Sequence, residues 1–154
     1  MKDAMQQLLI RQLTAKMKPY ESISDIGKPS RGWIYCIRST LGMSLRQLGD
    51  RLNMTPQGVR KLESNEAHGK ITMKKMEDLA RALEMDFVYG FVSWHGGLEK
   101  MIEHRAQQLA QEIVARTHQT MVLEDQQISK EKLKEEVKDL TATIVSEMPK
   151  HIWD

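Results

Sequence analysis

Residues 44–64 read SLRQLGDRLNMTPQGVRKLES and contain the most informative structural pattern in the chain. Apolar residues recur at helical spacing on both sides of Asn53, which predicts two short helices joined by a tight turn. Asn53 suits the turn because asparagine tolerates a positive φ. Gly49 is small where the first helix must let the second approach closely. The shared core is expected to contain Leu48, Leu52, Met54, Val59 and Leu62.

Capping residues stand at the start of each of these helices. Ser44 is a predicted N-cap, and Gln47 three residues later has the spacing of a capping box. Thr55 is a predicted N-cap for the second helix, with Pro56 at its first position. Two capped helices around a tight turn predict a helix-turn-helix unit. A helical bundle with a fortuitous loop is the alternative.

A helix-turn-helix unit places its second helix in the major groove of DNA. Here that helix is expected to span residues 56–64, with Val59 and Leu62 facing inward. The outward set is then Gln57, Gly58, Arg60 and Lys61. Glutamine bonds adenine bidentately, and lysine or arginine suits guanine O6 and N7. Gly58 would allow close approach to DNA but weakens the helix interior. The alternative is that Arg60 and Lys61 are ordinary solvated charges.

Residues near the helix N-termini are expected to contact phosphates. Backbone N–H groups at a helix N-terminus attract anions, and Ser44, Arg46 and Thr55 lie there. The complete expected DNA-binding set is Ser44, Arg46, Gln47, Thr55, Pro56, Gln57, Gly58, Arg60 and Lys61. The charge distribution agrees with this placement. Residues 31–70 carry seven Lys or Arg against three Asp or Glu, whereas residues 98–154 carry eight against eleven.

Three segments are expected in a mainly α fold. Residues 1–30 predict an N-terminal helical arm, with apolar positions at helical spacing up to Pro19, and then a linker. Residues 31–97 predict the helix-turn-helix domain, with a loop at residues 64–71. Residues 98–154 predict a C-terminal helical region for dimerisation or partner binding.

Residues 86–92, DFVYGFV, are rich in aromatic and β-branched residues and predict one short strand. A single strand in a helical protein needs a partner, and pairing with the same strand of a second copy is one solution. The candidate dimer contacts are therefore this strand, the N-terminal arm and the C-terminal helices.

Composition excludes several classes of protein. The chain has 154 residues, a formal net charge of +2 and one cysteine, Cys36, which excludes a disulfide framework and a multi-cysteine zinc site. No apolar run is long enough to cross a membrane, and the N-terminus is too polar for a signal peptide, so the expected location is the cytoplasm. No enzyme or cofactor is expected, since the sequence has no glycine-rich phosphate loop. No metal site is expected, because the five histidines are scattered without zincin spacing.

Residues 31–85 resemble the phage-repressor (Xre) class of helix-turn-helix domains. The resemblance rests on residues 43–55, MSLRQLGDRLNMT, and on residues 59–63, VRKLE. It implies a domain that binds DNA with its second helix. The departures from the class are Pro56, Gly58 and a longer loop at residues 65–70.

More narrowly, the chain is similar to the family called mobile mystery protein A over most of residues 1–127. The similarity rests on RGWI at 31–34, KLESNEA at 61–67, ITM at 71–73, DFVYGFV at 86–92, QQLA at 107–110 and MVLEDQ at 121–126. The resemblance implies a neighbouring gene for a Fic-domain protein, and therefore a toxin–antitoxin pair with this chain as antitoxin and autorepressor. Two-fold binding by a helix-turn-helix protein would require a homodimer on an inverted repeat.

The rival hypothesis is a protein-binding module that inhibits a Fic-domain enzyme directly, with DNA binding secondary. Fic-inhibitory helices carry Ser or Thr, three residues, Glu, and then Gly or Asn. Two pairs have the first spacing, but neither is followed by Gly or Asn: Thr120 with Glu124, and Thr143 with Glu147. Direct inhibition would instead use the apolar helical faces of residues 98–154.

Overall fold

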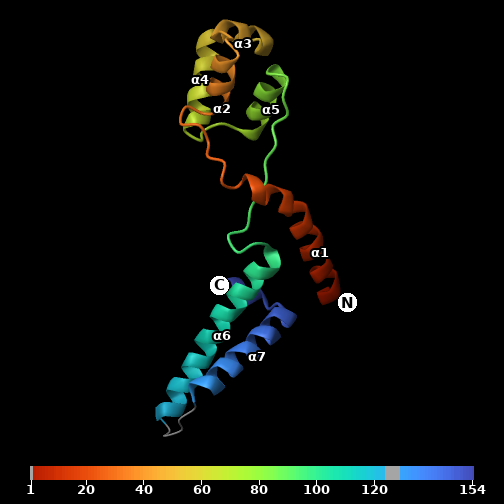
Figure 1. The fold of residues 1–154 in the computed structure, drawn as a ribbon, viewed down its shortest axis with the longest axis vertical. Coiled ribbons are helices and arrows are strands. Elements are labelled where there is room, and N and C mark those ends of the chain that lie inside the picture. Colours follow the sequence, from red (N-terminus) through yellow and green to blue (C-terminus); the bar gives the residue numbers. More distant parts are fainter. Residues whose placement is uncertain (1, 124–128) are drawn as a thin grey trace. The chain divides into compact units, whose positions relative to one another are not determined.

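A computed structural model of the chain describes residues 2–123 and 129–154. Over these ranges the regular elements are all helices (Figure 1). The α-helices are α1 (Lys2–Met17), α2 (Trp33–Thr40), α3 (Leu45–Leu52), α4 (Pro56–Ala67), α5 (Met73–Ala82), α6 (Leu98–Leu123) and α7 (Lys130–Glu147). Two short 3-10 helices are η1 (Lys18–Ile23) and η2 (Lys150–Trp153). The predicted mainly helical fold, with an N-terminal helix and C-terminal helices, is confirmed.

Contacts along the chain divide it into two compact units. The central unit is Ser24–Tyr89, and the terminal unit combines Met1–Ile23 with Gly90–Asp154. The N-terminal helix and the C-terminal helices therefore share one unit, although they lie at opposite ends of the sequence. Among the described residues, no helix is both long enough and apolar enough to cross a membrane.

The central unit packs α2, α3, α4 and α5 around one apolar core. Its buried members are Ile34, Leu48, Val59, Leu79 and Leu83. Leu48 of α3 and Val59 of α4 have no exposed surface, and burying each contributes about 1.5–3 kcal/mol. Leu52, Met54 and Leu62 pack against this core half-buried. Asn53 joins α3 to α4 with φ 53° and ψ 45°, so the predicted left-handed turn is confirmed.

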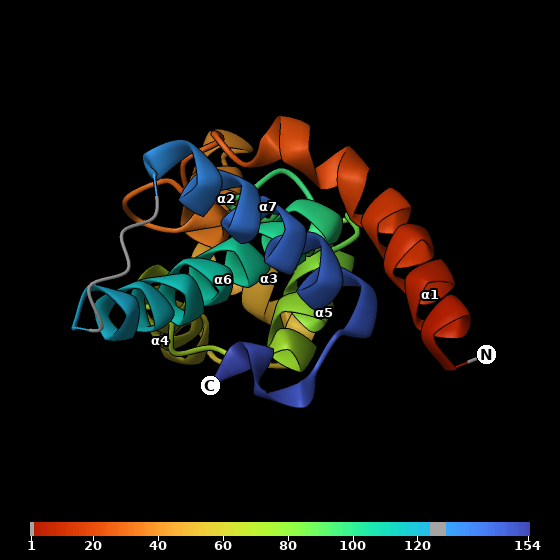
Figure 2. The same ribbon diagram turned by 90° about the horizontal axis from the view of Figure 1, so that it is seen from below.

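The terminal unit is built on α6 and α7, which lie against each other in both views (Figure 1 and Figure 2). Its buried core is Ile102, Ala106, Ala110, Ile144 and Ile152. Ala106 and Ala110 have no exposed surface, and their small side chains let the two helices approach closely. Ile10 of α1 packs against this core. Arg105 Nε donates to the Ile152 carbonyl at 2.6 Å and so holds η2 to α6.

The predicted strand at residues 86–92 is wrong. These residues form an irregular connection, in which Val88 and Phe91 are 69% and 79% exposed. Aromatic and β-branched residues favour a strand only where a neighbouring strand supplies the hydrogen-bond ladder. No strand is present in residues 2–123 or 129–154 to supply one.

Candidate nucleic-acid interface

The predicted caps of α3 and α4 are present. Ser44 Oγ accepts from the Gln47 N–H at 3.1 Å, and Gln47 Oε1 accepts from the Ser44 N–H at 2.8 Å, which completes a capping box. Thr55 Oγ1 accepts from the Gly58 N–H at 3.1 Å, with Pro56 in the first turn. In these caps the side chains of Ser44, Gln47 and Thr55 act only as hydrogen-bond acceptors. The hydroxyl hydrogens of Ser44 and Thr55 and the amide hydrogens of Gln47 are therefore donors suited to a phosphate.

Two glycines shape the turn between the helices. A Cβ on Gly49 would lie 2.6 Å from the Met54 carbonyl oxygen of the turn and 3.5 Å from Val59 Cγ2 of α4, so the tightest approach at Gly49 is made by the turn rather than by the second helix that was expected there. A Cβ on Gly58 would lie 3.1 Å from Met54 Cε and 3.3 Å from Thr55 Oγ1. The structure thus supplies a packing reason for Gly58 within the domain, and its approach to DNA stays a prediction.

The outward face of α4 is polar and cationic. Gln57, Arg60, Lys61 and Ser64 are all exposed, and their spacing of three and four residues places them on one side of the helix. Gln57, Arg60 and Lys61 belong to the expected DNA-binding set, whereas Ser64 was expected only to end the helix. The helical spacing that selects Gln57, Arg60 and Lys61 also selects Ser64, one turn further along α4.

Glu63 on α4 is turned inward, to a buried arginine of α2. Arg38 Nε lies 2.5 Å from Glu63 Oε1 and Nη2 lies 3.2 Å from Oε2. Arg38 also donates through Nη1 to the Met43 carbonyl at 2.7 Å. The hydrogen bond to Glu63 raises the pKa of Arg38 against the opposing effect of burial. Arg38 therefore stays protonated, and the Glu63 side chain is turned away from the outward face.

Glu66, the second carboxylate of α4, is also buried against α2. Its Oε1 accepts the Trp33 N–H at 2.8 Å and so caps the first turn of α2. Gly32 has φ +83°, and a Cβ there would lie 1.7 Å from Glu66 Oε2, so only glycine fits. Lys28 approaches the same residue, with Nζ 3.9 Å from Oε2.

Sequence reasoning missed both inward carboxylates. It placed Glu66 in a loop at residues 64–71, whereas α4 continues to Ala67. The signal was present in the spacing, because Val59, Glu63 and Glu66 recur at helical intervals on the buried side. The loop prediction is wrong for residues 64–67, because the contacts with α2 hold the last turn of α4, and the loop around Gly69 begins at His68.

All nine expected DNA-binding residues lie at the start of α3, at the start of α4 or along the first half of α4. Seven are exposed: Ser44, Arg46, Gln47, Thr55, Gln57, Arg60 and Lys61. Pro56 and Gly58 are half-buried. Arg46 Nη1 lies 3.8 Å from Asp50 Oδ2, and both side chains are largely exposed. An exposed pair of this kind is weak, so Arg46 can exchange Asp50 for a phosphate.

Other chemistry-bearing residues form no comparable site. Within the described ranges, no three His, Cys, Asp or Glu side chains are grouped as a metal site would require. His95 and His104 stack with ring centroids 4.4 Å apart. Cys36 is half-buried on α2.

Comparison with known proteins agrees with this geometry. Residues 37–89 match the helix-turn-helix family model, a segment that contains α3, α4 and α5 entirely. No curated protein and no solved structure matches the chain. Residues 37–89 are therefore an Xre-type helix-turn-helix domain, the class of domain by which DNA-binding regulators contact DNA.

Proposed function

We propose that this chain is a sequence-specific transcriptional regulator that reads DNA with α4. One observation carries the proposal: the outward face of α4 presents Gln57, Arg60 and Lys61 and no carboxylate. Both carboxylates of the helix are withdrawn, since Glu63 and Glu66 are buried against α2. DNA is a polyanion, so an outward carboxylate would oppose binding.

The residues of this face have distinct roles. In the major groove, Gln57 hydrogen-bonds an adenine edge, and Lys61 donates to guanine O6 and N7. Arg60 contacts a base or a neighbouring phosphate. Phosphate contacts come from Arg46 and from the free donor hydrogens of the capping residues Ser44, Gln47 and Thr55.

A single domain of this kind covers only one half-site. The proposal therefore includes a homodimer on an inverted repeat, with half-site centres about 34 Å apart or a multiple of that distance. Footprinting tests the symmetry, because two protected blocks related by a two-fold axis are expected. One undivided block bound by a monomer would contradict it.

Fluorescence anisotropy with a duplex from the region upstream of the gene tests the DNA contact. Gln57→Ala and Lys61→Ala are expected to weaken specific binding by about 1–3 kcal/mol each, the cost of a lost bidentate base contact. Lys130→Ala, which removes an exposed lysine at the start of α7, is the matched control and should bind as the unmodified chain does. Equal affinities for all four proteins would contradict the proposal.

The finer proposal is an autorepressing antitoxin encoded beside a Fic-domain toxin. It is supported by the resemblance to the mobile mystery protein A family over most of residues 1–127. On this view the chain acts in the cytoplasm, where the operator of its own gene pair lies. Direct inhibition of the toxin, with DNA binding secondary, is the rival within the same setting.

Promoter exchange separates these two mechanisms. With the neighbouring gene under its native promoter, repression predicts that Gln57→Ala with Lys61→Ala abolishes protection from toxicity. With the neighbouring gene under a foreign promoter, protection can come only from contact between the two proteins. Protection by the double variant under the foreign promoter would favour direct inhibition.

The Fic-inhibitory spacing receives no support from residues that can be placed. Thr143 lies on α7 and donates to the Asp139 carbonyl at 3.1 Å, and Met148 stands where the motif needs Gly or Asn. The other pair includes Glu124, which lies outside the described residues. We therefore propose no inhibition through this motif, and contact through the apolar helical faces of residues 98–154 stays the rival to repression.

A further inference from the structure

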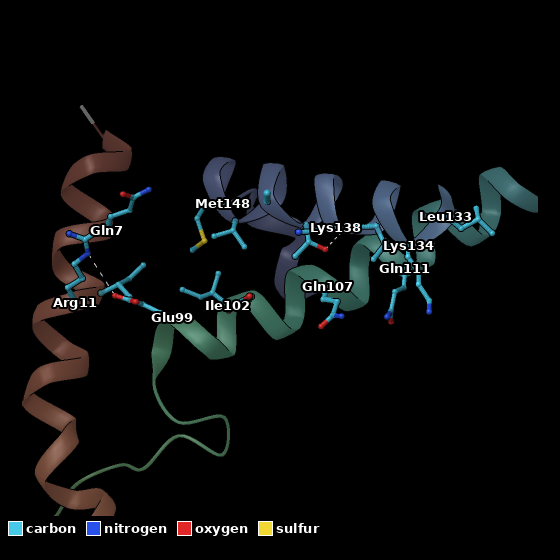
Figure 3. A pocket seen from close by; sticks show the side chains of 16 residues that line it. Gln7, Arg11, Glu99, Ile102, Gln107, Gln111, Leu133, Lys134, Lys138 and Met148 are labelled. Atoms are coloured by element: carbon cyan, nitrogen blue, oxygen red, sulfur yellow. Dashed lines mark hydrogen bonds and ion pairs between the residues drawn. The ribbon is translucent and has the colours of Figure 1, made fainter. Parts of the chain in front are cut away.

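The terminal unit contains a groove of about 1040 Å³ between α1, α6 and α7 (Figure 3). Apolar side chains form its floor, including Ile102 of α6 and Val137 and Val145 of α7. Charged side chains stand at its edges, with Glu103 on α6 and Lys134 and Lys138 on α7. The groove thus combines an apolar floor with charged edges of both signs. Grooves of this kind commonly bind the apolar face of an amphipathic helix.

Helix α1 of the same chain has an apolar face that is largely exposed among the described residues. Ile10 packs against the core formed with α6 and α7, but four large apolar side chains of α1 remain exposed. They are Met5 at 59%, Leu8 at 48%, Leu9 at 55% and Leu13 at 50%. Leu8, Leu9 and Leu13 lie three, four and eight residues after Met5, so the four side chains lie along one side of the helix. A contiguous exposed stripe of this kind marks an interaction surface, whereas scattered apolar residues do not.

The length of the groove matches the length of the stripe-bearing helix. The α6 lining runs from Glu99 to Gln111, about 18 Å at 1.5 Å per residue. In α1, Asp3 and Lys16 are about 20 Å apart on the same basis. A helix of the size of α1 therefore spans the groove from one end to the other.

The charges at the groove and on α1 predict the orientation of the bound helix. Glu99 lies at one end of the groove, and Lys134 lies toward the other, with Lys138 between them (Figure 3). Helix α1 carries Asp3 in its first turn and Lys16 in its last. A second α1 laid parallel to α7 places its Asp3 beside the lysines and its Lys16 beside Glu103, next to the exposed pair that Arg11 and Glu99 of the first chain form with Nε 3.9 Å from Oε1. Its apolar stripe then covers the floor.

We infer that the groove of the terminal unit binds α1 of a second copy of this chain. The contact is reciprocal, so the same two surfaces are used twice about a two-fold axis and the assembly closes as a dimer. The inference deepens the proposed function, which requires two copies, but it concerns the terminal unit and can be tested without DNA.

Sedimentation of the full chain without DNA is the first test. Leu9→Glu puts a charge on the stripe and Ala142→Glu puts one in the groove, and both positions are exposed in the single copy, so folding should survive. Each variant is expected to sediment as a monomer, while Gln108→Glu on an exposed position of α6 outside the groove stays dimeric. Thermal unfolding followed by circular dichroism confirms that the variants are folded. A monomeric unmodified chain, or a dimer that both charges leave intact, would overturn the inference.

Cross-linking identifies which surfaces meet. One chain carries Leu9→Cys and a second chain, with a tag that changes its size, carries Ala142→Cys, both in a Cys36→Ser background. Oxidation of the mixture is expected to yield the mixed-size dimer. A Leu9→Cys chain that instead cross-links only to itself would place α1 against α1 and overturn the groove assignment.

Charge reversal provides an independent measure of the orientation. Lys16→Glu is expected to weaken the dimer by about two- to fivefold, and adding Glu103→Lys is expected to restore it. Failure of the second change to restore the dimer would contradict the proposed direction of the bound helix. Because none of these measurements uses DNA, a dimer that passes them yet binds no operator would contradict the proposed function and leave this inference standing.

Discussion

Arg38 on α2 makes a two-point contact with Glu63 on α4, with Nε–Oε1 at 2.5 Å and Nη2–Oε2 at 3.2 Å. Both side chains are buried, at 11% and 7% exposure. The contact ties the DNA-facing helix to the helix behind it, and it also removes a negative charge from the side that would meet phosphates. One ion pair therefore serves both the stability and the electrostatics of the domain.

Breaking this pair on one side is expected to destabilise the chain strongly. Glu63→Ala should lower the free energy of unfolding by about 3–5 kcal/mol, because it leaves a buried guanidinium without its partner. Urea unfolding measures the loss. Removing both charges, as in Arg38→Met with Glu63→Leu, should cost much less, since no buried charge is left uncompensated. A double variant as unstable as Glu63→Ala would contradict this account.

The α2 N-terminus offers a test with a matched glycine control. Gly32→Ala should lower the free energy of unfolding by about 1–3 kcal/mol, because Gly32 has φ +83° and its Cβ would meet Glu66 Oε2. Gly27 has no heavy atom within 4 Å of a built Cβ, so Gly27→Ala should be neutral or stabilising by about 0.4–1 kcal/mol. Equal thermal stabilities of the two variants would count against the steric role of Gly32.

The two glycines of the turn region should behave differently. Gly49→Ala is expected to destabilise by about 1–3 kcal/mol, because its Cβ would contact the rigid Met54 backbone. Gly58→Ala meets the flexible end of the Met54 side chain, and the gain in helix propensity of about 0.5–1 kcal/mol offsets that crowding. Chemical unfolding compares their stabilities. If Gly58→Ala is stable but binds operator poorly, the glycine serves close approach to DNA as well as packing.

Salt dependence separates phosphate contacts from base contacts. Arg46→Ala should weaken binding to operator and to unrelated DNA alike, and it should reduce the slope of log affinity against log salt by about 1. Asp50→Ala, which removes the carboxylate 3.8 Å from Arg46, should leave operator binding unchanged or make it tighter. Titrations at several salt concentrations measure both effects. A loss confined to the operator would make Arg46 a base-reading residue.

Local features of the central unit were predicted correctly because they depend on neighbours in sequence. Ser44 and Thr55 cap their helices through residues three positions away. Asn53 adopts the left-handed turn that asparagine tolerates, and Gly49 lies at the close approach. Each of these features involves residues no more than five positions apart in the sequence.

The failed predictions depended on distant partners. Residues 86–92 have the composition of a strand, but no strand of residues 2–123 or 129–154 lies beside them to complete a ladder. Glu66 was assigned to the loop expected at residues 64–71, whereas it lies on α4, where its buried carboxylate accepts the Trp33 N–H, 33 residues earlier in the chain.

The amino-acid sequence alone determined that two capped helices meet at Asn53 and that Gln57, Arg60 and Lys61 share the outer side of the second helix. Helical periodicity and capping depend on covalent spacing, so they can be read before the chain is folded. Only the folded chain brings Glu63 and Glu66 to their partners on α2 and joins α1 to α6 and α7 with an apolar stripe left exposed. A buried charge is tolerated only where a partner of opposite sign or a free donor stands opposite, and the partners here come from another helix.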